Sequence, residues 1–167
     1  MFCETIDFKS CCQTNEIVEF LYKIFKNDFI DTSCYLANTI YIDPKSHKKK
    51  EGKEEIFWHV VTRKERGSRR LDKHRASRIR WIKPIISNHN DEAIKMFYYF
   101  EDTKKVRLYL WAFRVDFVVI LQKLGNSSSY LVTSFYIDNQ KKRDVFEKKF
   151  NDYQDKKDSR LSGCEWF

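Results

Sequence analysis

Three apolar, β-prone segments lie close together in the second half of the chain, at residues 94–101, 106–121 and 129–137. Only the short polar stretches DTKK and KLGNSSS separate them. The middle segment is long enough for two strands with a tight bend near Arg114 and Asp116. Connections this short join antiparallel neighbours. The sequence therefore predicts an antiparallel sheet of about four strands.

Helical patterns flank these strands. Residues 15–28 repeat apolar side chains at helical spacing, with Thr14 or Asn15 available as the N-cap, and residues 140–153 form a final amphipathic helix. Residues 34–43 read as a short strand or extended arm that Pro44 ends. Because helices come first and strands last, the expected class is α+β, with N-terminal helices packed on the sheet and a C-terminal helix.

The length of 167 residues is that of one ordinary domain. Within it we expect an N-terminal helical or extended segment at 1–55, packed on the same domain. A core follows at 56–153, and a C-terminal tail at 154–167.

The composition is that of a folded, basic protein. Hydrophobic residues make up 42%, and 32 basic against 24 acidic residues give a net charge of +8, which favours an anionic partner. The five cysteines show no CxxC spacing, so neither a zinc site nor a closed disulfide framework is expected. The sequence shows no signal peptide and no run apolar enough to span a membrane. We therefore expect a cytoplasmic protein, and delivery as an effector is compatible with this.

Residues 56–83 combine an apolar segment with most of the positive charge. The stretch 56–63 carries His59 and favours a strand, although a run this short also fits a helix. Gly67 and Ser68 interrupt it, and the spacing over 71–81 predicts a helix with Asp72 in its first turn, which Pro84 kinks or ends.

Residues 63–83 hold ten basic and two acidic residues, a difference equal to the net charge of the whole chain. A solvated face is the ordinary reading of a charge run, but this density favours a surface that binds a polyanion. The residues assigned to nucleic-acid binding are Arg63, Arg66, Arg69, Arg70, Lys73, Arg80 and Lys83.

Several kinds of chemistry are poorly supported. Asp116 lacks the acidic-x-Lys pattern of restriction-type metal sites, and no HExxH or DxD spacing occurs. The four glycines are isolated, so no phosphate-binding loop is present. We expect neither a metal nor another cofactor.

Cleavage of RNA needs fewer catalytic groups and no metal ion, because RNA supplies its own nucleophile in the 2′-hydroxyl. His59 suits the general base, Arg75 and Arg78 could grip one phosphate as it gains charge, and Thr133 could hold a nonbridging oxygen. Each residue also has an ordinary interpretation: a core histidine, arginines that bind phosphate without chemistry, and a strand threonine. Residues that could add to the site are His74, Ser134 and Tyr136; His74 and His89 compete with His59 as the base.

The segments FWHVVTR, LDKHRASRIRWIKPII and SYLVTSFYI together resemble the phage- and toxin-associated branch of the superfamily that unites barnase, EndoU, colicin D and RelE-like ribonucleases. The resemblance implies helices on a four-stranded antiparallel sheet, with the site at His59, Arg75, Arg78 and Thr133. It also implies a structured RNA such as tRNA as substrate, and an acidic antitoxin or immunity-type protein as partner. The chain departs from the family's Thr-x-Tyr motif.

At that motif the family's tyrosine position holds Phe135, and Tyr136 follows one residue later. Because side chains alternate along a strand, Phe135 shares the face of Thr133 and Tyr136 lies on the opposite face. A phenolic role for Tyr136 would need a bulge in the strand.

The leading hypothesis is thus a metal-independent endoribonuclease. The alternative is a non-catalytic nucleic-acid-binding protein that uses a basic helix at 63–83, with aromatic rings available for stacking. A third hypothesis is an interaction protein whose basic face docks on an acidic partner or an anionic membrane.

Overall fold

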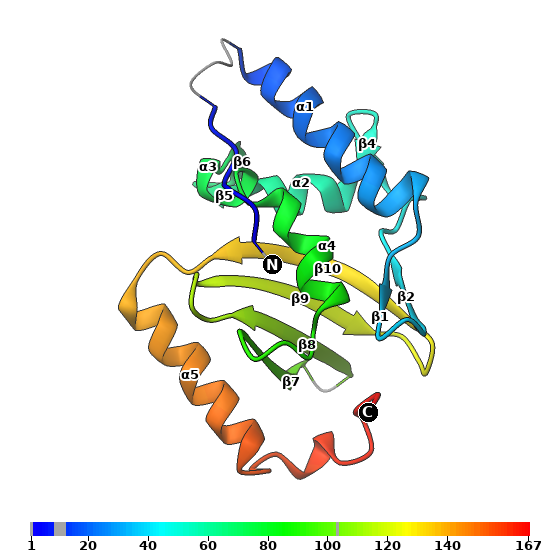
Figure 1. The fold of residues 1–167 in the computed structure, drawn as a ribbon, viewed down its shortest axis with the longest axis vertical. Helices are drawn as coiled ribbons and strands as arrows, with labels where there is room; N and C mark the ends of the chain where they lie inside the picture. The colour runs from blue at the N-terminus through cyan, green and yellow to red at the C-terminus, as the bar shows by residue number, and fades with distance from the viewer. Residues whose placement is uncertain (1, 9–12, 103) are drawn as a thin grey trace.

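The computed structural model describes residues 2–8, 13–102 and 104–167. Its centre is an antiparallel meander of four strands, β7 (Ile94–Asp102), β8 (Lys105–Ala112), β9 (Phe117–Lys123) and β10 (Ser128–Tyr136) (Figure 1). The bend between β8 and β9 falls at residues 113–116, where Asp116 has φ +51°. The α+β class and the meander predicted from the sequence are both confirmed.

The sheet is larger than predicted and it is mixed. Two short strands, β1 (Tyr35–Leu36) and β2 (Ile40–Asp43), extend it to six strands in the order β1-β2-β10-β9-β8-β7. Strand β2 pairs in parallel with β10. The expectation of about four antiparallel strands was therefore wrong, because a parallel pairing between segments so far apart in the chain leaves no local signal.

Helices lie over one face of this curled sheet, but the predicted packing of the N-terminal helix on the sheet itself is not confirmed, because that helix packs mainly against other helices. Helix α1 (Thr14–Lys26) continues into a π-helical turn, η1 (Asn27–Asp31), and packs against α2 (Glu55–Val61) and a 3-10 turn, η2 (Ile79–Trp81). Helix α4 (Ile82–Ser87) lies across β8 and β9 (Figure 1). The N-cap of α1 is Gln13, without a side-chain hydrogen bond, so the expected capping by Thr14 or Asn15 is not observed.

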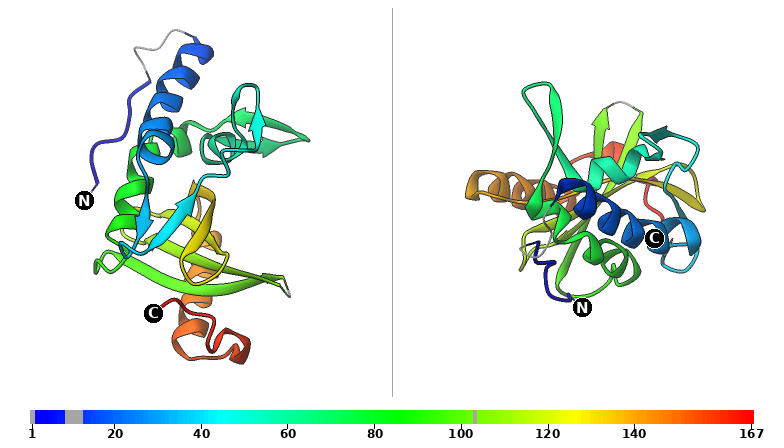
Figure 2. Two further views of the ribbon diagram at one scale, coloured as in Figure 1. Left: turned by 90° about the vertical axis from the view of Figure 1, so that its right-hand side faces the viewer. Right: turned by 90° about the horizontal axis from the view of Figure 1, so that it is seen from above.

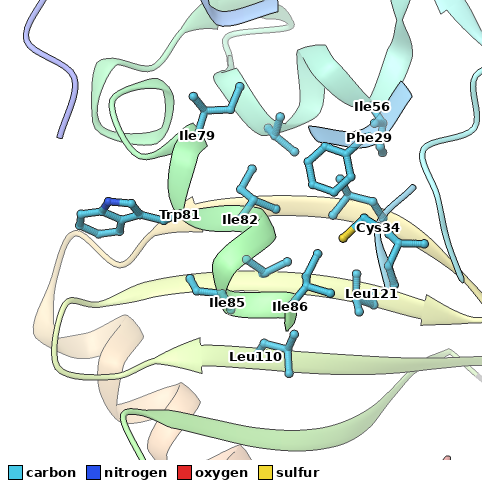
Figure 3. Packing of buried hydrophobic residues seen from close by; sticks show 14 of the residues in the cluster. Phe29, Cys34, Ile56, Ile79, Trp81, Ile82, Ile85, Ile86, Leu110 and Leu121 are labelled. Atoms are coloured by element: carbon cyan, nitrogen blue, oxygen red, sulfur yellow. The ribbon is translucent and has the colours of Figure 1, made fainter. Parts of the chain in front are cut away.

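The main hydrophobic core lies between these helices and the sheet. Ile82, Ile85 and Ile86 of α4 are fully buried, and Ile85 and Ile86 lie beside Leu110 and Leu121 of the strands (Figure 3). Side chains from the first 55 residues join the same cluster, Phe29 and Cys34 among them. The N-terminal segment is thus part of the core that positions the rest.

Helix α5 (Gln140–Gln154) covers the β7 side of the opposite face. Phe146 packs there against Phe97, Tyr109 and Trp111, with ring centroids 5.8–6.4 Å apart. A 3-10 turn, η3 (Ser159–Leu161), follows, and its Leu161 joins the main core. The helical spacing predicts Val145, Phe146, Phe150 and Tyr153 on the apolar face of α5, but Val145 points outward and is 48% exposed.

The segment with His59 differs most from the prediction, because it is helix α2 and not a strand. Its apolar residues Ile56, Phe57, Val60 and Val61 fall on one side of a helix and are all buried. Phe57 contacts the rings of α1, with its centroid 5.2 Å from that of Tyr22. Burial of this face against α1 therefore outweighs the β propensity of the residues.

The basic residues after α2 do not form one helix. Strands β5 (Thr62–Glu65) and β6 (Ser68–Leu71) form a hairpin with a two-residue turn, in which Arg66 and Gly67 both have positive φ, +46° and +85°. Such turns match the twist of paired strands. Helix α3 (Lys73–Ala76) begins after Asp72, which caps it, and ends within one turn because Arg78 leaves the helical region. A second small hairpin precedes α2, formed by β3 (Lys49–Lys50) and β4 (Lys53–Glu54).

Candidate functional site

The predicted site residues meet beside strand β10. Strand β2 pairs with β10 only over Ser128–Tyr130, and α2 and α3 lie along the rest of β10. The Thr133 hydroxyl donates a hydrogen bond to the main-chain carbonyl of His59 (3.1 Å). Arg75 Nη1 donates to the same oxygen (3.1 Å) and to the carbonyl of Thr62 (3.0 Å). His59, Arg75 and Thr133 are thus brought together, although the shared atom is a backbone oxygen.

Arg75 holds the C-terminal end of α2 in this arrangement. Its guanidinium caps carbonyls that the helix leaves without intrahelical partners, at the negative end of the helix dipole. Burial lowers the pKa of Arg75, and Asp72, with Oδ2 3.7 Å from Nε, opposes this shift. Arg75 therefore holds the end of α2 in place.

Arg78 is placed differently. Its Nη1 donates to the carbonyl of His74 (2.7 Å), and its guanidinium lies 4.4 Å from the centroid of the Tyr136 ring. The His74 ring also stacks on Tyr136, with centroids 5.8 Å apart. Tyr136 therefore packs against His74 of α3 and against Arg78, which follows α3.

Arg75 and Arg78 approach opposite faces of β10. Arg75 lies 5.6 Å from the Phe135 ring, and Phe135 and Tyr136 pack into different hydrophobic clusters on the two faces of the sheet. The structure therefore does not bring the two guanidinium groups onto one phosphate. A bulge at Val132 leaves Thr133 and Phe135 on one face, with Tyr136 on the other. Ser134 is buried, and its hydroxyl has no hydrogen-bond partner among the described residues.

The imidazole of His59 has the environment of a general base. The side chain is 33% exposed, and Nε2 lies 3.9 Å from Glu55 Oε1. Burial lowers the pKa of His59 most, the charges of Arg69, Lys45 and Arg75 lower it further, and Glu55 raises it. The lowered pKa favours the neutral imidazole, which can accept a proton. We call these five residues the His59 site: Lys45, Glu55, His59, Arg69 and Arg75.

Sequence reasoning missed Lys45. It follows β2 with φ +51°, and its main-chain N–H donates to Asp43 Oδ1 (2.6 Å). Its Nζ lies 4.0 Å from the centroid of the Tyr130 ring on β10. Burial first, and then Lys48 and Arg107, lower the pKa of Lys45. Only the parallel pairing of β2 with β10 places Lys45 here, so no local motif could have revealed it.

The β5–β6 hairpin forms a separate basic ribbon. It stands away from the body of the molecule in both views of Figure 2. Its strands pair Arg63 with Arg70 and Lys64 with Arg69. Like charges directly opposite one another are destabilising, and at Arg63 the carboxylates of Glu65 (2.9 Å) and Asp138 (3.4 Å) compensate them. Every residue from 63 to 70 is exposed.

The other predicted binding residues lie elsewhere. Arg80 and Lys83 line a cavity of about 630 Å³ between α1 and α4, together with Phe20 and Asp28. Lys73 lines a smaller cavity beside the N-terminal residues 5–8. The seven residues assigned to nucleic-acid binding therefore lie on three surfaces.

Further observations bound the chemistry. The described residues contain no group of three or more His, Cys, Asp or Glu side chains that could hold a metal ion. Within the same ranges, no helix is long and apolar enough to cross a membrane. Comparison with models of known protein families, with curated proteins and with solved structures gives no match to the chain.

Proposed function

We propose that the protein is a metal-independent endoribonuclease in which His59 is the general base. The observation that carries the proposal is the His59 site itself. A partly exposed imidazole with a lowered pKa lies among three cations, Lys45, Arg69 and Arg75, at the edge of a curled sheet. Positive charge around a neutral base is the combination that attack by a 2′-hydroxyl on phosphate requires.

In the proposed reaction, His59 takes the proton of the 2′-hydroxyl, and the 2′-oxygen attacks the adjacent phosphorus. The bond to the 5′-oxygen of the next nucleotide breaks, which leaves a 2′,3′-cyclic phosphate and a 5′-hydroxyl. Arg69 and Arg75 stabilise the charge on the phosphorane. Lys45, whose pKa burial lowers, is the candidate acid that protonates the leaving oxygen.

The proposed substrate is a structured RNA such as tRNA. The β5–β6 hairpin would approach its phosphates, since a ribbon with five exposed basic side chains attracts a polyanion. An acidic antitoxin or immunity-type protein would neutralise the enzyme by covering the same charges. Both proposals depend on the basic surface and on the resemblance described above.

The test is cleavage of total tRNA in EDTA, beside a 2′-deoxy oligonucleotide, by the wild type and by His59→Gln. We expect the wild type to cut RNA only, with 2′,3′-cyclic phosphate ends, and His59→Gln to lose at least about 100-fold in rate. His89→Gln is the matched control, because burial also lowers the pKa of His89, away from the His59 site. Equal cleavage by His59→Gln and the wild type would contradict the proposal.

The exposed hairpin also favours a second candidate, a non-catalytic nucleic-acid-binding protein. The basic element in this case is a β-ribbon and not the helix expected at 63–83. Binding without chemistry predicts an affinity that falls steeply with salt and no product after prolonged incubation. The same assay therefore separates the two candidates.

A further inference from the structure

Three tyrosines, one each on β1, β2 and β10, share the sheet face opposite α4. Ile40 and Ile42 of β2 point into the core, whereas Tyr41 between them points the other way and is 36% exposed. Tyr35 of β1 is 43% exposed, and its ring centroid is 5.8 Å from that of Tyr41. We call Tyr35, Tyr41 and Tyr130 the tyrosine strip.

The register of the strands leads this strip toward His59. Tyr41 lies opposite Ser128 of β10 and Asp43 lies opposite Tyr130, so Tyr130 is the next residue along on the same face. Lys45 Nζ lies 4.0 Å from the centroid of the Tyr130 ring, and the charge of Lys45 lowers the pKa of His59. The strip therefore runs from the outermost strand to the edge of the His59 site.

Positive charge accompanies the rings. Arg107 of β8 lies opposite Gln122 of β9, which in turn lies opposite Tyr130, so the three side chains share one face. Arg107 Nε is buried and has no hydrogen-bond partner among the described residues. The positive charges of Lys48 and Arg107 both lower the pKa of Lys45. Helix α5 packs at the far edge of this face, on β7, and Arg107, Gln122 and Tyr130 are partly exposed.

We infer that the tyrosine strip binds a single-stranded segment of RNA, with bases stacked on Tyr35 and Tyr41 and phosphates held by Lys45 and Arg107. Exposed rings beside unpaired cations are the arrangement by which proteins hold unstacked bases without reading their sequence. A duplex keeps its bases stacked on one another and cannot use the rings. Only the delivery of the next nucleotide to His59 rests on the proposed ribonuclease function.

The test measures binding of a fluorescent 2′-O-methyl oligonucleotide of about ten nucleotides, which lacks the reactive hydroxyl. We expect the single strand to bind more tightly than the same strand in a duplex. Tyr35→Ala and Tyr41→Ala should each weaken single-strand binding about fivefold or more. Tyr35→Phe and Tyr41→Phe should bind as the wild type does, because a phenyl ring also stacks.

The matched control is Phe167→Ala, which removes an exposed ring, 55%, that lies beside His89 and outside the tyrosine strip. Circular dichroism and thermal unfolding check that each variant is folded. A second measurement replaces one uridine with 5-bromouridine and maps the photo-cross-link, which we expect within residues 35–41. Unchanged affinity in the double alanine variant, or equal losses for single strand and duplex, would overturn the inference.

The outcomes separate the strip from the ribonuclease. If the oligonucleotide binds through the tyrosines but no RNA is cut, the strip stands and the ribonuclease proposal fails. If RNA is cut with dependence on His59 but the tyrosine variants bind and cut as the wild type does, the strip fails and the ribonuclease stands.

Discussion

The carbonyl oxygen of His59 accepts hydrogen bonds from two side chains, so the two donors should be energetically coupled. Thr133→Val removes one donor with little change in shape. Arg75→Met removes the other donor, and its bond to Thr62, while keeping an apolar stem over Phe135. In either single variant the carbonyl keeps one of the two side-chain donors; in the double variant it loses both.

The magnitudes follow from the number and kind of bonds lost. Thr133→Val removes one neutral hydrogen bond and should cost about 1 kcal/mol of unfolding free energy. Arg75→Met removes two hydrogen bonds from a charged donor and should cost about 2–3 kcal/mol of unfolding free energy. The loss is not larger because the variant also avoids the desolvation cost of burying the guanidinium. The double variant should cost about 1–2 kcal/mol more than the sum, because a partly buried carbonyl is then left without either side chain.

Urea unfolding of the four proteins, followed by circular dichroism, measures this double-mutant cycle. The slope of unfolding free energy against urea concentration must be the same in all four proteins before their free energies are compared. A different slope in one variant would show that its unfolded state differs in compactness. Additivity within about 0.3–0.5 kcal/mol would refute the idea that Thr133 and Arg75 together fix the end of α2. We expect Thr133→Val to keep some RNA cleavage and His59→Gln to lose it. This difference would show that Thr133 positions the end of α2, whereas His59 takes part in the reaction.

Two further predictions concern pH and salt. Burial holds the pKa of His59 below its ordinary 6.5, so between the two values the unfolded chain binds more protons than the native state. The contribution of His59 to stability is therefore full well above pH 6.5, falls as the pH drops from 6.5 toward the lowered pKa, and levels off below it. His59→Gln should flatten this fall in urea unfolding between about pH 7.5 and 5; a fall that only His89→Gln removes would be the contrary result. In RNA binding, Arg66→Ser and Arg70→Ser on the hairpin should each reduce the slope of log affinity against log salt by about 0.7–0.9, whereas the exposed Lys141→Ser on α5 should leave the slope unchanged.

The elements with strong periodicity could be predicted from the sequence. Helix α1 has its apolar side chains at helical spacing over more than three turns, and the four strands of the meander are separated by short polar turns. These patterns are local, so they survive in the folded protein. The two-residue turn at Arg66 and Gly67 was likewise signalled by the glycine, although its hairpin was not.

The segment around His59 could not be predicted, because its short apolar run fits a strand and a helix equally well. Contacts with α1 decide the outcome, and these depend on residues about thirty positions earlier. The sequence predicted only part of the His59 site, because contacts between distant segments also assemble this site. His59, Arg75 and Thr133 were predicted as neighbours, but Lys45 reaches them through a parallel strand pairing that no local pattern reveals.

That pairing also sets the order of events during synthesis. The partner of β2 is β10, whose first residue is made long after Asp43, so β2 has to wait for its neighbour. At about 5–20 residues per second the wait is of the order of ten seconds on the ribosome. Thr133, which holds the end of α2, is made just as late. A nascent chain that stops before β10 has neither a closed sheet edge nor an assembled site, so any activity begins only after β10 has been synthesised.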